Sequence, residues 1–118
     1  MAMTLEVVEL TSSLEAASQA REAVRAALDR SSQDTIDHAC LIVDELVAGA
    51  LVAVGAPVRL VLESHADHLV VEVLDAGISE VAVGDRIGIA QTLLDTWATA
   101  WGSLEQASGT SVWFNIAT

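Results

Sequence analysis

The stretch that decides the fold is residues 41–51, LIVDELVAGAL. Its apolar residues recur every three or four positions, which is the spacing of one face of an α-helix. The same pattern extends over residues 35–53, so we expect one long helix there. Glu45 and Gly49 are four positions apart and therefore share a face of that helix. The acidic side chain of Glu45 is thus followed on its own face by a residue that has no side chain.

Around this helix the sequence predicts two more helices and five strands. Apolar residues at helical spacing indicate helices over 14–28 and 87–100. Alternating patterns and turn signals indicate strands over 5–10, 58–64, 69–74, 103–106 and 111–116. The expected order is therefore β-α-α-β-β-α-β-β. Because each amphipathic helix needs an apolar surface to cover, we predict a single domain over residues 1–118. Its class would be an α+β two-layer sandwich, a mixed sheet with the helices on one face.

The segments between these elements have the residues typical of caps and turns. Ser12 precedes Glu15 by three positions, which is the spacing of a capping box. The polar residues 31–34 end the first helix and cap the second, and residues 55–57, GAP, end the second. Residues 65–68 have the length of a hairpin loop.

The composition is both acidic and apolar. The chain has 17 Asp+Glu against 5 Lys+Arg, a formal net charge of −12. A surface that binds a nucleic-acid duplex needs clustered cations, so we do not expect nucleic-acid binding. The hydrophobic fraction of 53% suggests apolar surface that a protein partner or a second copy would cover. A basic partner would be favoured by long-range electrostatics.

Neither membrane insertion nor metal binding is indicated by the sequence. The longest uncharged apolar run, residues 46–58, is shorter than the roughly 20 residues that cross a bilayer. No basic and apolar leader is present, so we expect a cytoplasmic protein. The single cysteine, Cys40, is predicted to be a small buried residue. His38, His65 and His68 lack the spacing of zinc ligands and are expected to be solvated or capping residues.

Three segments taken together resemble a known family. They are residues 44–50, DELVAGA, residues 71–77, VEVLDAG, and residues 109–114, GTSVWF. In this order and spacing they are similar to the GHKL (histidine-kinase/Hsp90-type) ATPases, and most of all to the anti-sigma-factor serine kinases. The resemblance covers nearly the whole chain. It implies a Bergerat-like fold that binds ATP in the family.

The first segment implies a catalytic role for Glu45 and the loss of a metal ligand. In the family, the glutamate at this position acts as a base or orients water near the γ-phosphate. An asparagine four residues later ligates magnesium, which requires oxygen ligands. Gly49 stands at that position and offers no side-chain oxygen. The alternative for Glu45 is a partly buried acid that caps or pairs locally.

The second segment implies an adenine contact. In the family, the aspartate matching Asp75 accepts a hydrogen bond from the adenine amino group. The glycine matching Gly77 lets the backbone approach the base. Asp75 follows a strongly apolar strand, as that role requires. The alternative is a turn residue at a strand end.

The lid that covers the phosphates in the family is altered here. Its glycine-rich turn opens a helix and presents backbone N–H groups to phosphate. Gly88 matches one glycine of that turn, but Arg86 stands where the first is expected. Gly88 follows Asp75 by 13 positions, which is short for a lid over a triphosphate. We expect Arg86 to be a solvated residue at a helix start, with a phosphate contact as the alternative.

The tryptophans form a separate feature. Trp97 and Trp101 are four positions apart and are predicted to share a face of the third helix, with Trp113 packed beneath it. The alternative is an apolar surface for a partner, because tryptophan is enriched at binding hot spots.

These departures predict a degenerate GHKL-type regulatory domain that acts by protein–protein binding, with weak or no ATP binding and no metal site. The partner would be a sigma factor, an anti-sigma antagonist, another regulator or a second copy of the chain. The alternative is an ATP-dependent serine kinase of the anti-sigma type. That enzyme would use Glu45 for catalysis, Asp75, Gly77 and Gly88 for nucleotide, and ATP with magnesium as cofactor. A third hypothesis is a structural or small-ligand domain without a nucleotide role.

Overall fold

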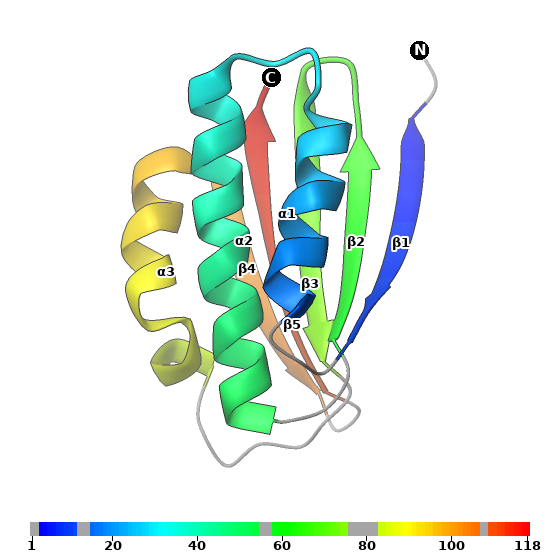
Figure 1. Cartoon of the computed structure of the whole chain (residues 1–118). Helices are drawn as coiled ribbons and strands as arrows, with labels where there is room; N and C mark the ends of the chain where they lie inside the picture. The colour runs from blue at the N-terminus through cyan, green and yellow to red at the C-terminus, as the bar shows by residue number, and fades with distance from the viewer. Residues whose placement is uncertain (1–2, 12–14, 55–57, 76–82, 107–108) are drawn as a thin grey trace.

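Five strands form one sheet, and three helices lie against one of its faces (Figure 1). This computed structural model describes residues 3–11, 15–54, 58–75, 83–106 and 109–118, without the side chains of residues 52–54, 83–87 and 106. In chain order the described elements are β1 (Thr4–Leu10), α1 (Glu15–Ala27), α2 (Gln33–Val54), β2 (Val58–Ser64), β3 (His68–Asp75), α3 (Val83–Trp97), β4 (Ala100–Gln106) and β5 (Gly109–Ala117). The predicted α+β two-layer class is confirmed.

The sheet has the strand order β1-β2-β3-β5-β4, and every neighbouring pair is antiparallel. The prediction of a mixed sheet was therefore wrong. The short connections after β2 and after β4 explain the pairing of those strands, because a parallel pair needs a crossover of a dozen or more residues. The turn after β2 is closed by a hydrogen bond of 2.9 Å from the His65 N–H to the His68 carbonyl, as expected for a hairpin.

The hydrophobic core lies between the sheet and the helices. α1 contacts β1 and β2, α2 contacts the central strands, and α3 contacts β4 and β5. Alternate residues of each central strand point into this layer, as the pleat requires. The buried apolar residues of β2, β3 and β5 are Val58, Leu60, Leu62, Leu69, Val71, Val73, Val112, Phe114 and Ile116. On the helices the buried residues include several alanines, such as Ala16, Ala20 and Ala39, which let the helix backbones approach the strands closely.

The long helix begins where the sequence predicts a cap. The Ser32 hydroxyl oxygen accepts a hydrogen bond of 3.2 Å from the Thr35 N–H, so it satisfies one of the amide groups that a helix start leaves without a partner. The predicted cap is confirmed at Ser32, and residues 33 and 34 already belong to α2. The expected capping-box serine, Ser12, and the stop signal at 55–57 lie outside the described residues.

The third helix ends earlier than expected, and this moves one tryptophan. α3 ends at Trp97, and the Thr99 N–H already donates to the Asn115 carbonyl at 2.9 Å. Trp101 therefore lies on β4, and the prediction that Trp97 and Trp101 share a helix face was wrong. The Trp101 indole N–H donates to the Asp95 carboxylate at 2.9 Å. The backbone from Thr99 onward pairs with β5, and this tertiary pairing overrides the helix that the spacing of the two tryptophans predicted.

Trp113 lies on the opposite side of the sheet from the helices. Its neighbours Val112 and Phe114 are buried in the core, and successive residues of a strand point to opposite faces. A Cβ atom on Gly102 would come within 2.9 Å of the Trp113 Nε1 atom, so the indole lies directly over Gly102. The prediction that Trp113 packs beneath the third helix was wrong. Trp101 takes the position against the core instead.

Among the helices in the described part of the chain, none is long and apolar enough to cross a bilayer.

Candidate functional site

Glu45 and Gly49 lie within α2, which runs without interruption from Gln33–Val54. Glu45 is half-buried, and it makes no hydrogen bond or ion pair with the residues that the structure describes. The ion pair at this point is made by its neighbour, because Arg21 of α1 contacts the Asp44 carboxylate at 2.5 Å. The local pairing proposed as the alternative role of Glu45 thus belongs to Asp44.

Gly49 leaves this face of α2 without a second oxygen ligand. Its only oxygen is the backbone carbonyl, which inside an α-helix accepts the hydrogen bond of the residue four positions later. No three His, Cys, Asp or Glu side chains of the described residues come together as a metal site. In the described part of the chain, the helix position that carries the magnesium ligand in the GHKL family therefore offers no side-chain oxygen.

Asp75 is the last residue of β3, and its side chain is only 6% exposed. It is paired across the sheet with Val58 of β2 and Thr110 of β5. Charged side chains are rarely buried without a partner, and Asp75 takes part in an interaction within the chain. Asp75 is thus a buried carboxylate at a strand end, and its predicted contact with adenine stays a prediction. Gly77, the second residue expected to approach adenine, lies outside the described residues.

Gly88 interrupts α3. Its backbone angles, φ 38° and ψ −116°, are not helical, and a positive φ of this kind is readily adopted only by glycine. The helix resumes after Gly88 and continues to Trp97. The backbone of Arg86 belongs to the helical turn before this break, and its side chain, which was expected to be solvated or to contact a phosphate, lies outside the described part of the chain.

The elements that carry these residues meet at one end of the sheet. The C-terminal half of α2, the end of β3 and the beginning of α3 all lie at the end opposite the β2–β3 turn (Figure 1). Glu45, Gly49, Asp75 and Gly88 therefore belong to three elements, of which α2 contacts both β3 and α3. Residues 76–82, which join two of these elements, lie outside the described part of the chain.

Some contacts between the helices were not predicted from the sequence. The His38 imidazole stacks on the Trp97 indole, with ring centroids 4.0 Å apart and planes 5° from parallel. His38 is thus half-buried between α2 and α3 rather than a capping residue. The only sequence signal for this stack is that both residues lie on the apolar stripes of their helices. Cys40 is buried as predicted, and burial raises the pKa of its thiol above 9.0.

The face of the sheet away from the helices is the second candidate site. We call it the open face, and it comprises Leu5, Val7 and Glu9 of β1, Arg59, Val61 and Glu63 of β2, Val70, Glu72 and Leu74 of β3, Ser111, Trp113 and Asn115 of β5, and Gly102 and Leu104 of β4. No described helix covers it (Figure 1). Leu5 is 56% exposed, Val7 52% and Leu104 54%.

The carboxylates on the open face each have a partner on or beside that face. Arg59 donates to Glu9 at 2.7 Å, and the Ser111 hydroxyl donates to Glu72 at 2.5 Å. His65, in the turn beside the face, contacts Glu63 at 2.8 Å. Each carboxylate of this face therefore has a hydrogen-bond partner, and Glu9 pairs with the cation Arg59. The side chains of Leu5, Val7 and Leu104 remain in contact with solvent.

We compared the chain with protein families and with curated proteins. No model of a protein family matches the chain. A search of curated proteins finds no match either.

Proposed function

We propose that this chain is a degenerate GHKL-type regulatory domain that acts by binding another protein through its open face. The observation that carries the proposal is the exposure of Leu5, Val7 and Leu104 on a sheet face that no described helix covers. Exposed apolar side chains on an uncovered sheet face favour a partner surface, and here they lie at both edges of the sheet, Leu5 and Val7 on β1 and Leu104 on β4. Trp113 lies on β5, the strand beside that of Leu104, and tryptophan is enriched at the energetic centres of interfaces.

The charges of the open face support a partner that is apolar at its centre. Covering an unpaired carboxylate costs several kcal/mol, on the order of the desolvation penalty of an ion. Glu9 already pairs with Arg59 within the face, and Glu72 accepts a hydrogen bond from the Ser111 hydroxyl, so a partner that covers Glu9 does not have to supply a cation to it. A sigma factor, an anti-sigma antagonist, another regulator or a second copy of the chain would be such a partner.

Weak or absent ATP binding is the second part of the proposal. Gly49 cannot supply the magnesium ligand that the family places four residues after the glutamate. Calorimetry with ATP and ADP, with and without magnesium, tests this part directly. Tight magnesium-dependent binding of ATP would overturn it.

A Gly49→Asn variant tests whether the missing side-chain ligand alone limits nucleotide binding. A gain in nucleotide affinity would show a site that lacks one ligand, whereas no gain would show that the rest of the site has changed as well.

The binding of a protein partner is tested with matched leucine variants. Leu104→Glu places a charge on the open face, and Leu41→Glu makes the same change at an exposed leucine of α2. Tagged wild-type and variant proteins are compared by quantitative mass spectrometry of the proteins that they retain. We expect a specific partner to be lost with Leu104→Glu and kept with Leu41→Glu. A partner that both variants retain equally would show that binding does not use the open face.

Self-association is measured separately by sedimentation velocity over a range of concentrations. A dimer of the wild-type chain that dissociates in Leu104→Glu but not in Leu41→Glu would identify the partner as a second copy. A monomer at all concentrations leaves the partner to be another protein.

An ATP-dependent serine kinase of the anti-sigma type is the second candidate. The observations that favour it are the burial of Asp75 at the end of β3 and the left-handed backbone of Gly88 before a helix. Transfer of labelled phosphate to a serine of a partner protein, lost in Glu45→Ala, would establish this function. Absence of transfer to every partner that the open face retains would exclude it for those partners.

A further inference from the structure

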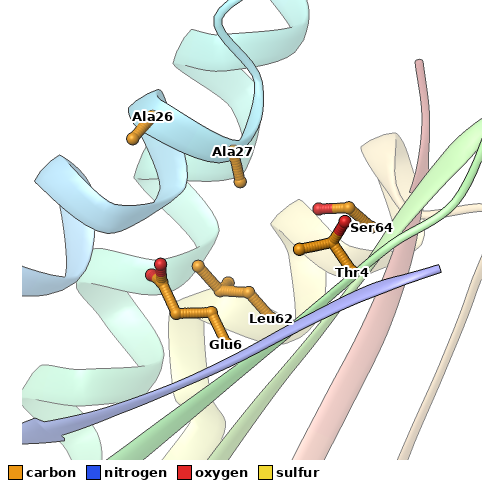
Figure 2. A pocket seen from close by; sticks show the side chains of 6 residues that line it. All are labelled: Thr4, Glu6, Ala26, Ala27, Leu62 and Ser64. Carbon is orange, nitrogen blue, oxygen red and sulfur yellow. The ribbon is translucent and has the colours of Figure 1, made fainter. Parts of the chain in front are cut away.

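A pocket opens between α1 and the edge of the sheet, on the helix side of β1 and β2 (Figure 2). Its volume is about 290 Å³ and it is lined by Thr4, Glu6, Ala26, Ala27, Leu62 and Ser64. Small-molecule sites usually have volumes of about 300–1,000 Å³. The pocket therefore has room for one small ligand or one long side chain. It lies at the beginning of β1 and the end of β2, away from the end of the sheet that carries Asp75.

The sequence of β1 explains why this space is not filled by the core. Leu10 is buried on the helix side of β1, and Val8 packs against the core. The next residues on that side toward the strand's beginning are Glu6 and Thr4, which are exposed. The facing residues of α1 are the alanines 26 and 27, which are too small to reach the strand. The pocket thus results from a change to polar residues on β1 opposite small residues on α1.

The polar groups of the pocket converge from two paired strands. Thr4 is the cross-strand partner of Ser64, and Glu6 is the partner of Leu62. In Figure 2 the Glu6 carboxylate points from β1 toward α1, and the hydroxyl groups of Thr4 and Ser64 lie beside each other. The side chains of these three polar residues make no hydrogen bond or ion pair with the described part of the chain. A carboxylate and two hydroxyl oxygens can therefore all accept hydrogen bonds from a ligand.

The end of α1 brings backbone carbonyl groups near the pocket, and the same last turn carries the basic residue Arg25. α1 ends at Ala27, so Ala26 and Ala27 belong to its last turn. The carbonyl groups of a last helical turn have no intrahelical partner and carry the negative end of the helix dipole. The formal net charge of the chain is −12, which raises the local concentration of cations around the whole molecule.

We propose that this pocket binds a cationic nitrogen group, an ammonium or a guanidinium, with its carbon chain against Ala26, Ala27 and Leu62. The cation donates hydrogen bonds to the Glu6 carboxylate and to the hydroxyl groups of Thr4 and Ser64. The group can belong to a free small molecule or to a lysine or arginine side chain of a protein. This site requires neither the nucleotide motifs nor the open face. The proposal is therefore independent of the proposed function.

Nuclear magnetic resonance titration of the ¹⁵N-labelled chain tests the proposal without any mutation. The probes are N-acetyl-arginine amide and N-acetyl-citrulline amide, which have the same length but differ in charge. We expect saturable shifts of the amide signals of Thr4, Glu6 and Ser64 with the arginine probe and at least about tenfold weaker binding of the citrulline probe. Equal binding of the two probes, or no shift at these residues up to about 50 mM, would overturn the proposal.

Two variants and one control locate the binding. Glu6→Gln removes the charge and keeps the shape, and we expect about tenfold weaker binding of the arginine probe. Ala26→Leu fills the pocket from an exposed position of α1, and we expect a similar loss. Glu9→Gln removes the same charge from the other face of β1 and should leave the affinity within about twofold. Unchanged affinity in both Glu6→Gln and Ala26→Leu would overturn the assignment to this pocket.

The source of the cation is distinguished by comparing two further probes. Agmatine carries a guanidinium as a free small molecule, and the capped tripeptide Ala-Arg-Ala carries one on a peptide. A free ligand is indicated if agmatine binds at least as tightly as the tripeptide. A protein side chain is indicated if the tripeptide binds more tightly and also shifts the amide signals of β1 beyond the pocket. If neither probe competes with N-acetyl-arginine amide, the proposal that all of these cations bind in the same pocket is contradicted.

Discussion

The two faces of the sheet differ although the same strands form both. On the helix side, Val71, Val112 and Phe114 are buried beneath α2 and α3, and Phe114 is 0% exposed. On the open face, Leu5, Val7 and Leu104 are each more than half exposed. Phe114 and Trp113 are consecutive residues of β5, yet one lies in the core and the other over Gly102. The comparison indicates that one face supplies stability and that the other is available for binding.

The largest expected effect is the difference between Phe114→Ala and Trp113→Ala. Phe114 is fully buried, and removing a buried aromatic ring costs about 3–5 kcal/mol of unfolding free energy. Trp113 is the larger side chain but is only half-buried, so we expect a loss of about 1 kcal/mol. Urea unfolding followed by circular dichroism measures both. Equal losses would contradict the distinction between the two faces.

The next effect concerns the contact between two strands of the open face. An alanine at position 102 would place its Cβ atom 2.9 Å from the Trp113 Nε1 atom, so the indole has to move. We expect Gly102→Ala to lower the unfolding free energy by about 1–3 kcal/mol. In a Trp113→Ala background the same change should cost much less, because the clash is removed. A cost that is the same in both backgrounds would show that the indole is not responsible.

A smaller effect is expected at Leu104. Because this residue is 54% exposed, Leu104→Glu should change the unfolding free energy by less than about 0.5 kcal/mol. The matched change in the core, Leu94→Glu, introduces a charge where the side chain is 0% exposed and should prevent stable folding. Circular dichroism and urea unfolding of the two variants make the comparison. Strong destabilisation by Leu104→Glu would show that the open face is part of the folded core.

The smallest effect lies in the β2–β3 turn, at the edge between the two faces. The His68 ring hydrogen-bonds the Asp67 carboxylate at 2.7 Å and lowers the Asp67 pKa below 3.8. The stabilisation from this pair is therefore present above pH 3.8 and is lost as the pH falls through the lower pKa of the folded state. Because Asp67 is exposed, the effect should be small.

This pH dependence is measured as the urea midpoint between about pH 5 and pH 2. We expect the wild-type midpoint to fall slightly more over that range than the midpoint of His68→Gln, which cannot carry the charge that stabilises the Asp67 carboxylate. Asp67→Asn should behave like His68→Gln. A steeper fall in either variant would contradict the role of the pair.

Much of the fold was predictable because its signals are local. The spacing of apolar residues in 35–53 and the cap at Ser32 depend on neighbours within a few positions, and α2 begins and ends within two residues of the predicted range. The strand 58–64 also agrees with its prediction. Trp101 was misplaced because its helical spacing to Trp97 is accidental. The backbone pairing of residues 99 and 115 that determines its position joins segments 16 positions apart.

Some features of the candidate site could likewise be predicted from the sequence, whereas others depend on tertiary contacts. The absence of a side-chain oxygen at Gly49 is a property of the sequence alone. The ion pair of Arg21 with Asp44 and the stack of His38 on Trp97 join different helices, so no local pattern predicts them. The pocket at Glu6 depends on which residues of α1 stand opposite β1, which is also a tertiary relation.

The sequence by itself determined most of the secondary structure of the described chain, the acidic charge and the absence of a side-chain oxygen at Gly49, because these follow from residue type and short-range spacing. The tertiary structure decided which side of each strand is buried. On β1, Leu5 and Val7 are as apolar as Val8 and Leu10, yet only the latter pair lies on the helix side. An alternating pattern identifies two faces of a strand, but the position of the helices decides which of them becomes the core.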